Sequence, residues 1–198
     1  MTFPTTPSIK AIQVGSNRPV STNYTLSGKR SVRQFASQYF TFSVEMPPLT
    51  QTQFQTISGY LISKKGAFNT FDFGYPIDNL GVDKNSSNVK TRTTHTTGAT
   101  SIACDGFSAS TNDVVKVGDL IKFAGHNKVY VVTGDVNSNG ASQGSIGIEP
   151  PLQSDLANNE VVDLNKPNVT VSLLQDDLIY SSDPTGLFYL SFELREVL

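Results

Sequence analysis

The sequence is poor in the residues that most often carry chemistry. It has one cysteine, Cys104, two histidines, His95 and His126, and no tryptophan. A single cysteine excludes an intrachain disulfide and a cysteine-based metal cluster, and the lack of tryptophan disfavours a site that stacks sugars. Charged residues make up only 16% of the chain, with a net charge of −2 and no long run of Lys or Arg. Non-specific binding to nucleic acid is therefore not expected.

Long apolar runs are missing as well. No stretch approaches the length of a transmembrane helix, so we expect no membrane partner. The first ten residues, MTFPTTPSIK, lack the apolar core of a signal peptide. We expect the chain to stay soluble, or to be exported only as part of an assembly. Its 198 residues suffice for one sizeable core or for two small ones.

Ser, Thr, Asn, Gln, Gly and Pro fill the composition instead, which is typical of a mainly β chain with many turns. The clearest pattern lies between Arg33 and Gly66. Apolar and polar residues alternate from Ala36 onward, and this predicts a long strand over Gln34–Met46 with one buried face. Pro47 and Pro48 end it, since proline has no N–H to donate to a sheet.

A short helix over about 50–65 should follow. Thr50 and Gln53 have the spacing of a capping box, and Phe54, Ile57 and Leu61 form one apolar stripe. The helix should end at Lys64 and Lys65, where its dipole favours cations, with Gly66 in the C′ turn.

The character of the chain changes near Asn79, and residues 85–98 are polar without periodicity. Short strands then follow at close spacing, which predicts a small antiparallel β-barrel. These strands are expected at Ser101–Cys104, Leu120–Phe123, Lys128–Val132, Ser145–Ile148 and Val161–Leu164.

Long alternating strands return at Val169–Leu174 and Leu187–Leu198, and two others are expected near the start, at Ser8–Val14 and Thr22–Leu26. We therefore predict a discontinuous β-sandwich domain, residues 1–83 and 167–198, with one covering helix, and an inserted barrel, residues 84–166. The shared core of the outer domain is predicted to contain Phe40, Phe42, Val44, Phe54, Ile57, Leu61, Phe188, Leu190 and Phe192.

The search for a chemical site yields no catalytic, cofactor-binding or metal-binding residue. His95 and His126 have no convergent partners at motif spacing and are interpreted as polar turn residues. Cys104 lies in an alternating strand and is interpreted as a small buried side chain. The segment from Asp135 to Gly140 resembles a calcium loop, but Ile146 stands where the acidic twelfth ligand belongs, so we predict a hairpin loop.

Lys29, Arg30 and Arg33 form the one basic group that could contact a partner. Ser27, Gly28, Lys29 and Arg30 are expected to form a hairpin tip. The alternative to an assembly contact is a solvated tip without a partner.

Two stretches resemble parts of virion proteins of tailed phages. The first runs from Arg33-Gln34-Phe35 through Phe40–Val44 and Met46–Thr50 to Phe71-Asp72-Phe73, and it resembles the outer domain of distal tail and tube-initiating proteins. The second includes Val117–Ile121, His126–Val132 and Ile148–Leu152, and it resembles the small barrel that such proteins carry as an insertion. The resemblance implies a tail-tube-like β-sandwich and no catalytic residue.

The leading hypothesis is a non-enzymatic structural subunit of a phage tail (tail tip, baseplate hub or connector), assembled in the host cytoplasm and located in the virion. Its partners would be copies of itself, in a ring that is sixfold by analogy, and neighbouring tail proteins, with DNA passing through the channel without specific binding. The first rival hypothesis is a glycan- or host-surface-binding module displayed on a virion. The second is a small hydrolase, although the acidic pairs that occur, such as Asp176-Asp177, form no familiar motif.

Overall fold

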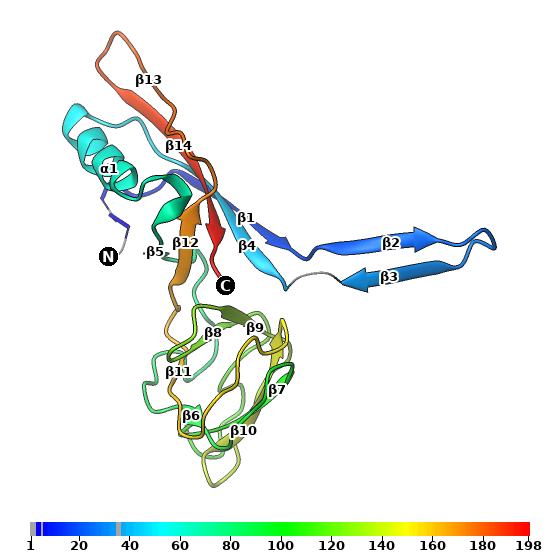
Figure 1. The fold of residues 1–198 in the computed structure, drawn as a ribbon. Coiled ribbons are helices and arrows are strands. Elements are labelled where there is room, and N and C mark those ends of the chain that lie inside the picture. The colour runs from blue at the N-terminus through cyan, green and yellow to red at the C-terminus, as the bar shows by residue number, and fades with distance from the viewer. Residues whose placement is uncertain (1–2, 5, 35–36) are drawn as a thin grey trace. The chain divides into compact units, whose positions relative to one another are not determined.

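The computed structural model describes residues 3–4, 6–34 and 37–198. Its contacts divide the chain into two compact units, an outer unit of residues 1–73 and 170–198 and a barrel unit of residues 74–169. The boundaries predicted from the sequence were 83/84 and 166/167. Strands dominate both units and the described chain has one α-helix, so the mainly β fold class is confirmed (Figure 1).

The outer unit is built on one six-stranded sheet. Its strands lie in the order β1, β4, β14, β12, β5, with β13 also paired to β14. Their bounds are Ala11–Asn17 for β1, Tyr39–Glu45 for β4, Phe71–Phe73 for β5, Val169–Leu173 for β12, Tyr180–Ser182 for β13 and Phe188–Glu196 for β14. The two long alternating strands, β4 and β14, are antiparallel neighbours, with Phe192 opposite Val44. In the described outer unit the layer against this sheet is a helix rather than a second large sheet.

Strand β4 has one buried face, as its alternation of apolar and polar residues predicted. Phe40, Phe42 and Val44 are buried, and the residues between them face the opposite side of the sheet. The predicted length of the strand is wrong, because β4 begins only at Tyr39. Gln34, where the long strand was expected to begin, is the last residue of β3 (Arg30–Gln34), and β3 pairs with β2 (Val20–Tyr24) rather than with β1. Phe35 and Ala36, which belonged to the prediction, lie outside the described residues.

Helix α1 spans Gln51–Ser63. The Gln53 side chain accepts a hydrogen bond from the Thr50 backbone N–H at 3.0 Å, which confirms the predicted capping arrangement. The predicted C′ turn is displaced by one residue, since Lys65 already has a left-handed φ of 56° and Gly66 follows with φ 63°. A short 3-10 helix, η1 (Gly66–Phe68), continues from there.

The predicted core of the outer unit is present. All nine residues are buried except Phe188, which is half-buried and stacks on Phe54 with ring centroids 4.5 Å apart. Phe3, to which the sequence analysis gave no role, joins this core, where its ring contacts Phe71, Phe73 and Phe192. A segment at the start of the described chain thus helps to cover the sheet.

The barrel unit has one sheet with the strand order β11, β8, β9, β10, β7, β6. The strands are β6 (Lys90–Thr91), β7 (Ser101–Asp105), β8 (Leu120–Phe123), β9 (Val129–Val132), β10 (Gln143–Glu149) and β11 (Val162–Asp163). A bridge between Lys90 and Val161 brings the two ends of this order together, so the sheet is nearly closed. The inserted barrel and its five predicted strands are confirmed, whereas β6 falls in the polar segment 85–98, where periodicity indicated no strand.

Buried polar side chains fix the start of this unit to the barrel. The Asn79 amide bonds the backbone of Leu120 on both its N–H and its carbonyl, at 2.8 and 2.7 Å. The Asp119 carboxylate accepts hydrogen bonds from the backbone N–H groups of Leu80, Gly81 and Lys116 at 2.7–3.0 Å. The bonds to Leu120 and Gly81 satisfy backbone groups of buried residues, which would otherwise lack partners.

Candidate assembly surface

Strands β2 and β3 and the turn between them form a two-stranded arm, residues 20–34. Among the described residues these two strands pair only with each other. The turn is closed by hydrogen bonds between Thr25 and Lys29, and Gly28 adopts a φ of 77° that favours glycine. The expected hairpin tip is therefore present.

The three basic residues predicted as an assembly contact all lie exposed on the arm. Lys29 is in the turn, Arg30 is opposite Tyr24, and Arg33 is opposite Ser21. Because successive residues of a strand point to opposite faces, Arg30 and Arg33 lie on different faces of the arm. The structure thus brings Lys29 and Arg30 together near the tip and separates Arg33 from them.

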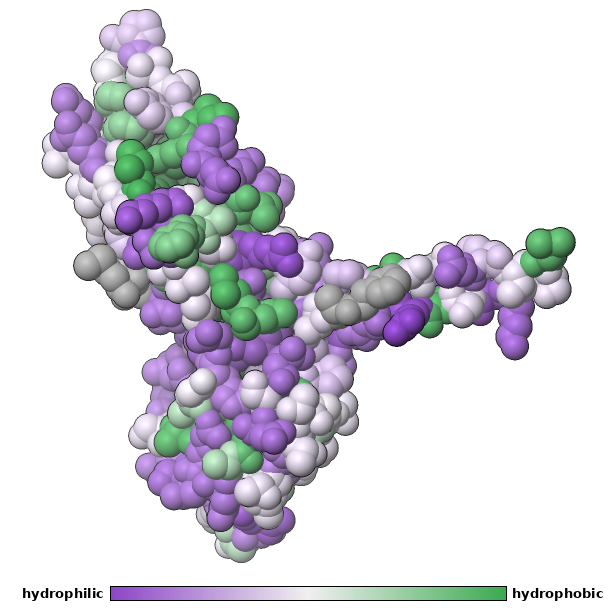
Figure 2. Space-filling model, in the orientation of Figure 1, coloured by the Kyte–Doolittle hydropathy of each residue, from purple (hydrophilic) through white to green (hydrophobic). Residues whose placement is uncertain are grey.

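The arm also exposes apolar side chains that the sequence analysis did not single out. Val20, Tyr24 and Val32 share one face, and each is at least half exposed. Leu26 in the turn is fully exposed. Figure 2 shows hydrophobic residues along the arm and at its end, among hydrophilic ones. Every residue of β2 and β3 is exposed except Ser21, so the arm has no core of its own.

The second candidate surface is the open face of the outer sheet. It carries the odd-numbered residues of β4 and β14, among them Tyr39, Thr41 and Ser43. Arg195 lies over the Tyr39 ring at 4.1 Å, and Asn17 donates a hydrogen bond to Thr41 at 2.9 Å. The face is therefore polar and is partly organised by its own contacts.

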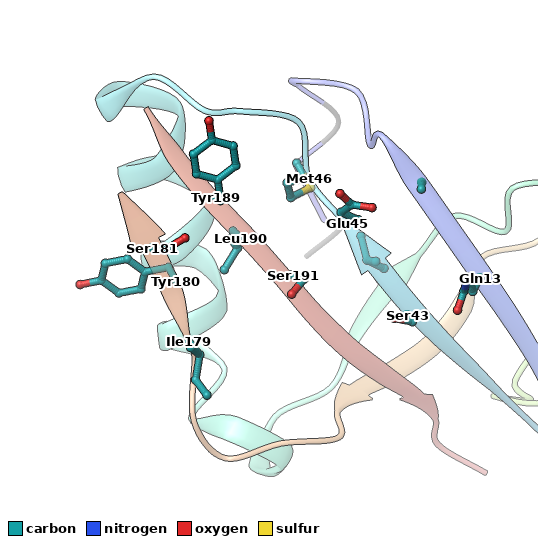
Figure 3. A pocket seen from close by; sticks show the side chains of 12 residues that line it. Gln13, Ser43, Glu45, Met46, Ile179, Tyr180, Ser181, Tyr189, Leu190 and Ser191 are labelled. Atoms are coloured by element: carbon teal, nitrogen blue, oxygen red, sulfur yellow. The ribbon is translucent and has the colours of Figure 1, made fainter. Parts of the chain in front are cut away.

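Two shallow hollows lie on this face. One, of about 520 Å³, is bordered by β1, β4, β13 and β14, and Figure 3 shows its lining side chains, with Ile179 and Tyr180 at the β13 margin. The other, of about 390 Å³, lies beside it and is lined by Leu174, Glu193 and Arg195 together with residues of β1 and β4. Leu174 thus borders the second hollow, and Ile179 and Tyr180 border the first.

The segment between β12 and β13 connects these borders and is acidic. Asp176 and Asp177 are exposed, and they are flanked by the exposed apolar residues Leu174, Ile179 and Tyr180. Asp176 accepts a long hydrogen bond from the Ala67 N–H, 3.4 Å between the heavy atoms. We call residues 174–180 the acidic segment.

The residues excluded as chemical sites have structural roles. His95 Nε2 accepts a hydrogen bond from the Ala103 N–H at 3.1 Å, so this ring bridges two segments of the barrel. His126 packs edge-on against Phe123, with Nε2 3.9 Å from the Glu160 carboxylate. Burial raises the pKa of the Cys104 thiol to about 12, which keeps it protonated and unreactive at neutral pH.

The loop that resembles a calcium site also turns its oxygens to the backbone. The side-chain oxygens of Asp135, Asn137 and Asn139 each accept a hydrogen bond from a backbone N–H. The donors are Val117 at 2.9 Å, Asp113 at 2.8 Å and Ala141 at 2.9 Å, respectively. The ligands that a cation would need are thus engaged in holding the loop, as the hairpin interpretation expects.

The described residues contain no group of three or more His, Cys, Asp or Glu side chains placed to hold a metal ion. None of their helices is long and apolar enough to cross a membrane. No family model matches the chain, and no curated protein matches it. The surfaces described above are thus the basis for a functional proposal.

Proposed function

We propose that this protein is a non-enzymatic structural subunit of a phage tail, which forms a ring with copies of itself and contacts neighbouring tail proteins. The arm is the observation that carries the proposal. A two-stranded hairpin is at best marginally stable alone in water, and it gains stability when further strands or a packed layer cover it. An arm with exposed apolar side chains on one face and cations near its tip is suited to being covered by another subunit.

The rest of the outer unit is compatible with this role. The polar open face of the sheet suits a wet channel or a seam between subunits, as the resemblance to tail proteins implies. Contacts of one surface with a different surface on the next copy close into a ring when the rotation between copies is right. Each copy then covers the arm of its neighbour.

Electron microscopy tests the proposal directly. An antibody against residues 74–169, applied to purified particles of the phage that encodes this chain, should decorate one position along the tail. Rings should be visible in images of the purified protein or, if it needs a neighbouring ring as a template, in partial tails. Particles that lack the protein altogether would exclude the structural role.

A further inference from the structure

The charge of the chain is distributed unevenly, and the arm is one of its basic parts. Residues 20–34 contain Lys29, Arg30 and Arg33 and no carboxylate. Since the whole chain has a net charge of −2 and the arm contributes +3, the remaining residues carry −5. A basic arm on an otherwise acidic protein has a complementary surface available on every other copy of the same chain.

The acidic segment matches the arm in both charge and apolar character. It places Asp176 and Asp177 between Leu174 on one side and Ile179 and Tyr180 on the other, with exposed fractions of 45%, 69% and 54% for these three. Near its tip the arm places Lys29 and Arg30 beside Tyr24 and Leu26. Among the described residues no side chain pairs with the Asp177 carboxylate. Each surface thus offers a charged centre with an apolar border.

We propose that the arm of one copy docks on the acidic segment of a second copy, with Lys29 and Arg30 facing Asp176 and Asp177. This inference rests on the proposed function, because it names the partner surface within the ring. The arm and the acidic segment are both exposed in the single chain, so neither covers the other there. The hollows beside the segment provide concave surface for the apolar side chains of the arm.

The contact is heterologous, since two different surfaces of the same chain meet. Every copy then has one arm to give and one acidic segment to receive, so the same contact repeats around a ring. Because the charges at its centre are exposed before docking, the contact should form faster and more tightly at low ionic strength.

Charge reversal on either side tests the pairing. One full-length variant carries Lys29→Glu and Arg30→Glu, and another carries Asp176→Lys and Asp177→Lys. In each the arm and the acidic segment have like charges, so the association constant measured by sedimentation at low salt should fall at least about tenfold. A mixture of the two variants should regain association, because each arm then meets an oppositely charged segment on the other chain.

The control variant carries Lys84→Glu and Arg92→Glu, two exposed cations of the barrel with the same change of charge. It should associate like the wild type, and when mixed with the Asp176→Lys, Asp177→Lys variant it should associate no more than the wild type does in the same mixture, because both keep the original arm and acidic segment. Stronger association in the control mixture would mean that overall charge governs association, and the inference would be wrong. A further variant carries all four reversals, two in the arm and two in the acidic segment. If this variant associates while the mixture of the arm variant and the segment variant does not, the arm docks on the acidic segment of its own chain.

Cysteine trapping detects the contact between the arm and the acidic segment even if the wild type is monomeric at equilibrium. Leu26→Cys in one tagged chain and Ile179→Cys in another should form a covalent heterodimer under mild oxidation, while buried Cys104 does not react. Ile62→Cys, at a residue that is 64% exposed on α1, is the matched control partner. Equal trapping at Ile179→Cys and Ile62→Cys would overturn the inference. If rings are nevertheless present in particles, the proposed function stands and only the docking site is wrong.

Discussion

Phe42 of β4 lies directly opposite Leu194 of β14, although the whole barrel separates the two residues in the sequence. Both side chains are buried, with exposed fractions of 1% and 0%. The first and last parts of the chain therefore share one hydrophobic core, and the outer unit cannot form until both are present.

Truncation of Phe192 should test this shared core. Its side chain is 4% exposed, and its ring lies 5.6 Å from that of Phe3. Phe192→Ala should lower the free energy of unfolding by about 3–5 kcal/mol, since it removes a large apolar group and leaves a cavity. Glu193→Ala, at the next residue on the open face, should change it by less than about 0.5 kcal/mol. Urea unfolding of both variants measures the difference, and equal effects would contradict the assignment of the two faces.

Removal of the barrel should leave the outer unit folded. The Lys166 ammonium lies 2.7 Å from the Asp78 carboxylate, so the two ends of the barrel unit are close together. A short Gly/Ser linker in place of residues 79–165 should therefore join the two parts of the outer unit without strain. The product should show one cooperative thermal transition and dispersed amide signals. Insoluble or unfolded product would show that the outer unit depends on the barrel.

A side chain at Gly106 should damage the barrel. Its φ is +86°, and a Cβ placed there would lie 2.2 Å from the carbonyl oxygen of Asn88. Gly106→Ala should therefore cost at least about 2 kcal/mol of unfolding free energy, because strain and a backbone clash act together. Gly98→Ala, at φ +90° with open space around the Cβ, is the matched control and should cost only the strain of about 1 kcal/mol. Similar losses at the two sites would argue against the clash.

Acid should weaken the turn before β14. The hydroxyl of Thr185 and the Leu187 N–H both donate to Asp183, at 2.5 and 3.1 Å, and they hold the pKa of its carboxyl below the ordinary value. A lowered folded pKa gives stability that is complete well above the unfolded value of about 3.9 and is lost as the pH falls through the folded pKa. Asp183→Asn should thus be less stable than the wild type at pH 7, with a difference that shrinks toward pH 2. A difference that stays constant with pH would rule out this carboxylate as the cause.

Charge reversal at the tip of the arm should leave the fold intact. Lys29 and Arg30 are exposed and form no ion pair with another described residue, so Lys29→Glu with Arg30→Glu should leave the thermal midpoint of the monomer nearly unchanged. Incorporation into particles should nevertheless fall. Differential scanning calorimetry and quantitation of the protein in purified particles measure the two effects separately. Normal incorporation would exclude the tip as an assembly contact.

The periodicity of the sequence predicted the strands whose faces differ most in polarity. The alternation around Phe40, Phe42 and Val44 identified a buried face, and the same pattern identified the buried face of β14. Turn residues at close spacing were enough to predict the barrel. These features are local, because each depends on side chains within a few residues of one another.

The sequence by itself thus determined the mainly β class, the capped helix, the inserted barrel and the lack of any familiar catalytic motif. Only the tertiary structure decided that β3 leaves the outer sheet to form an arm with β2, and that Arg30 and Arg33 lie on opposite faces of it. It also decided that the ends of the acidic segment border the hollows of the open face. The physical reason is that alternation shows which face of a strand is buried but not which strand it pairs with, since that partner is chosen by contacts far away in the chain.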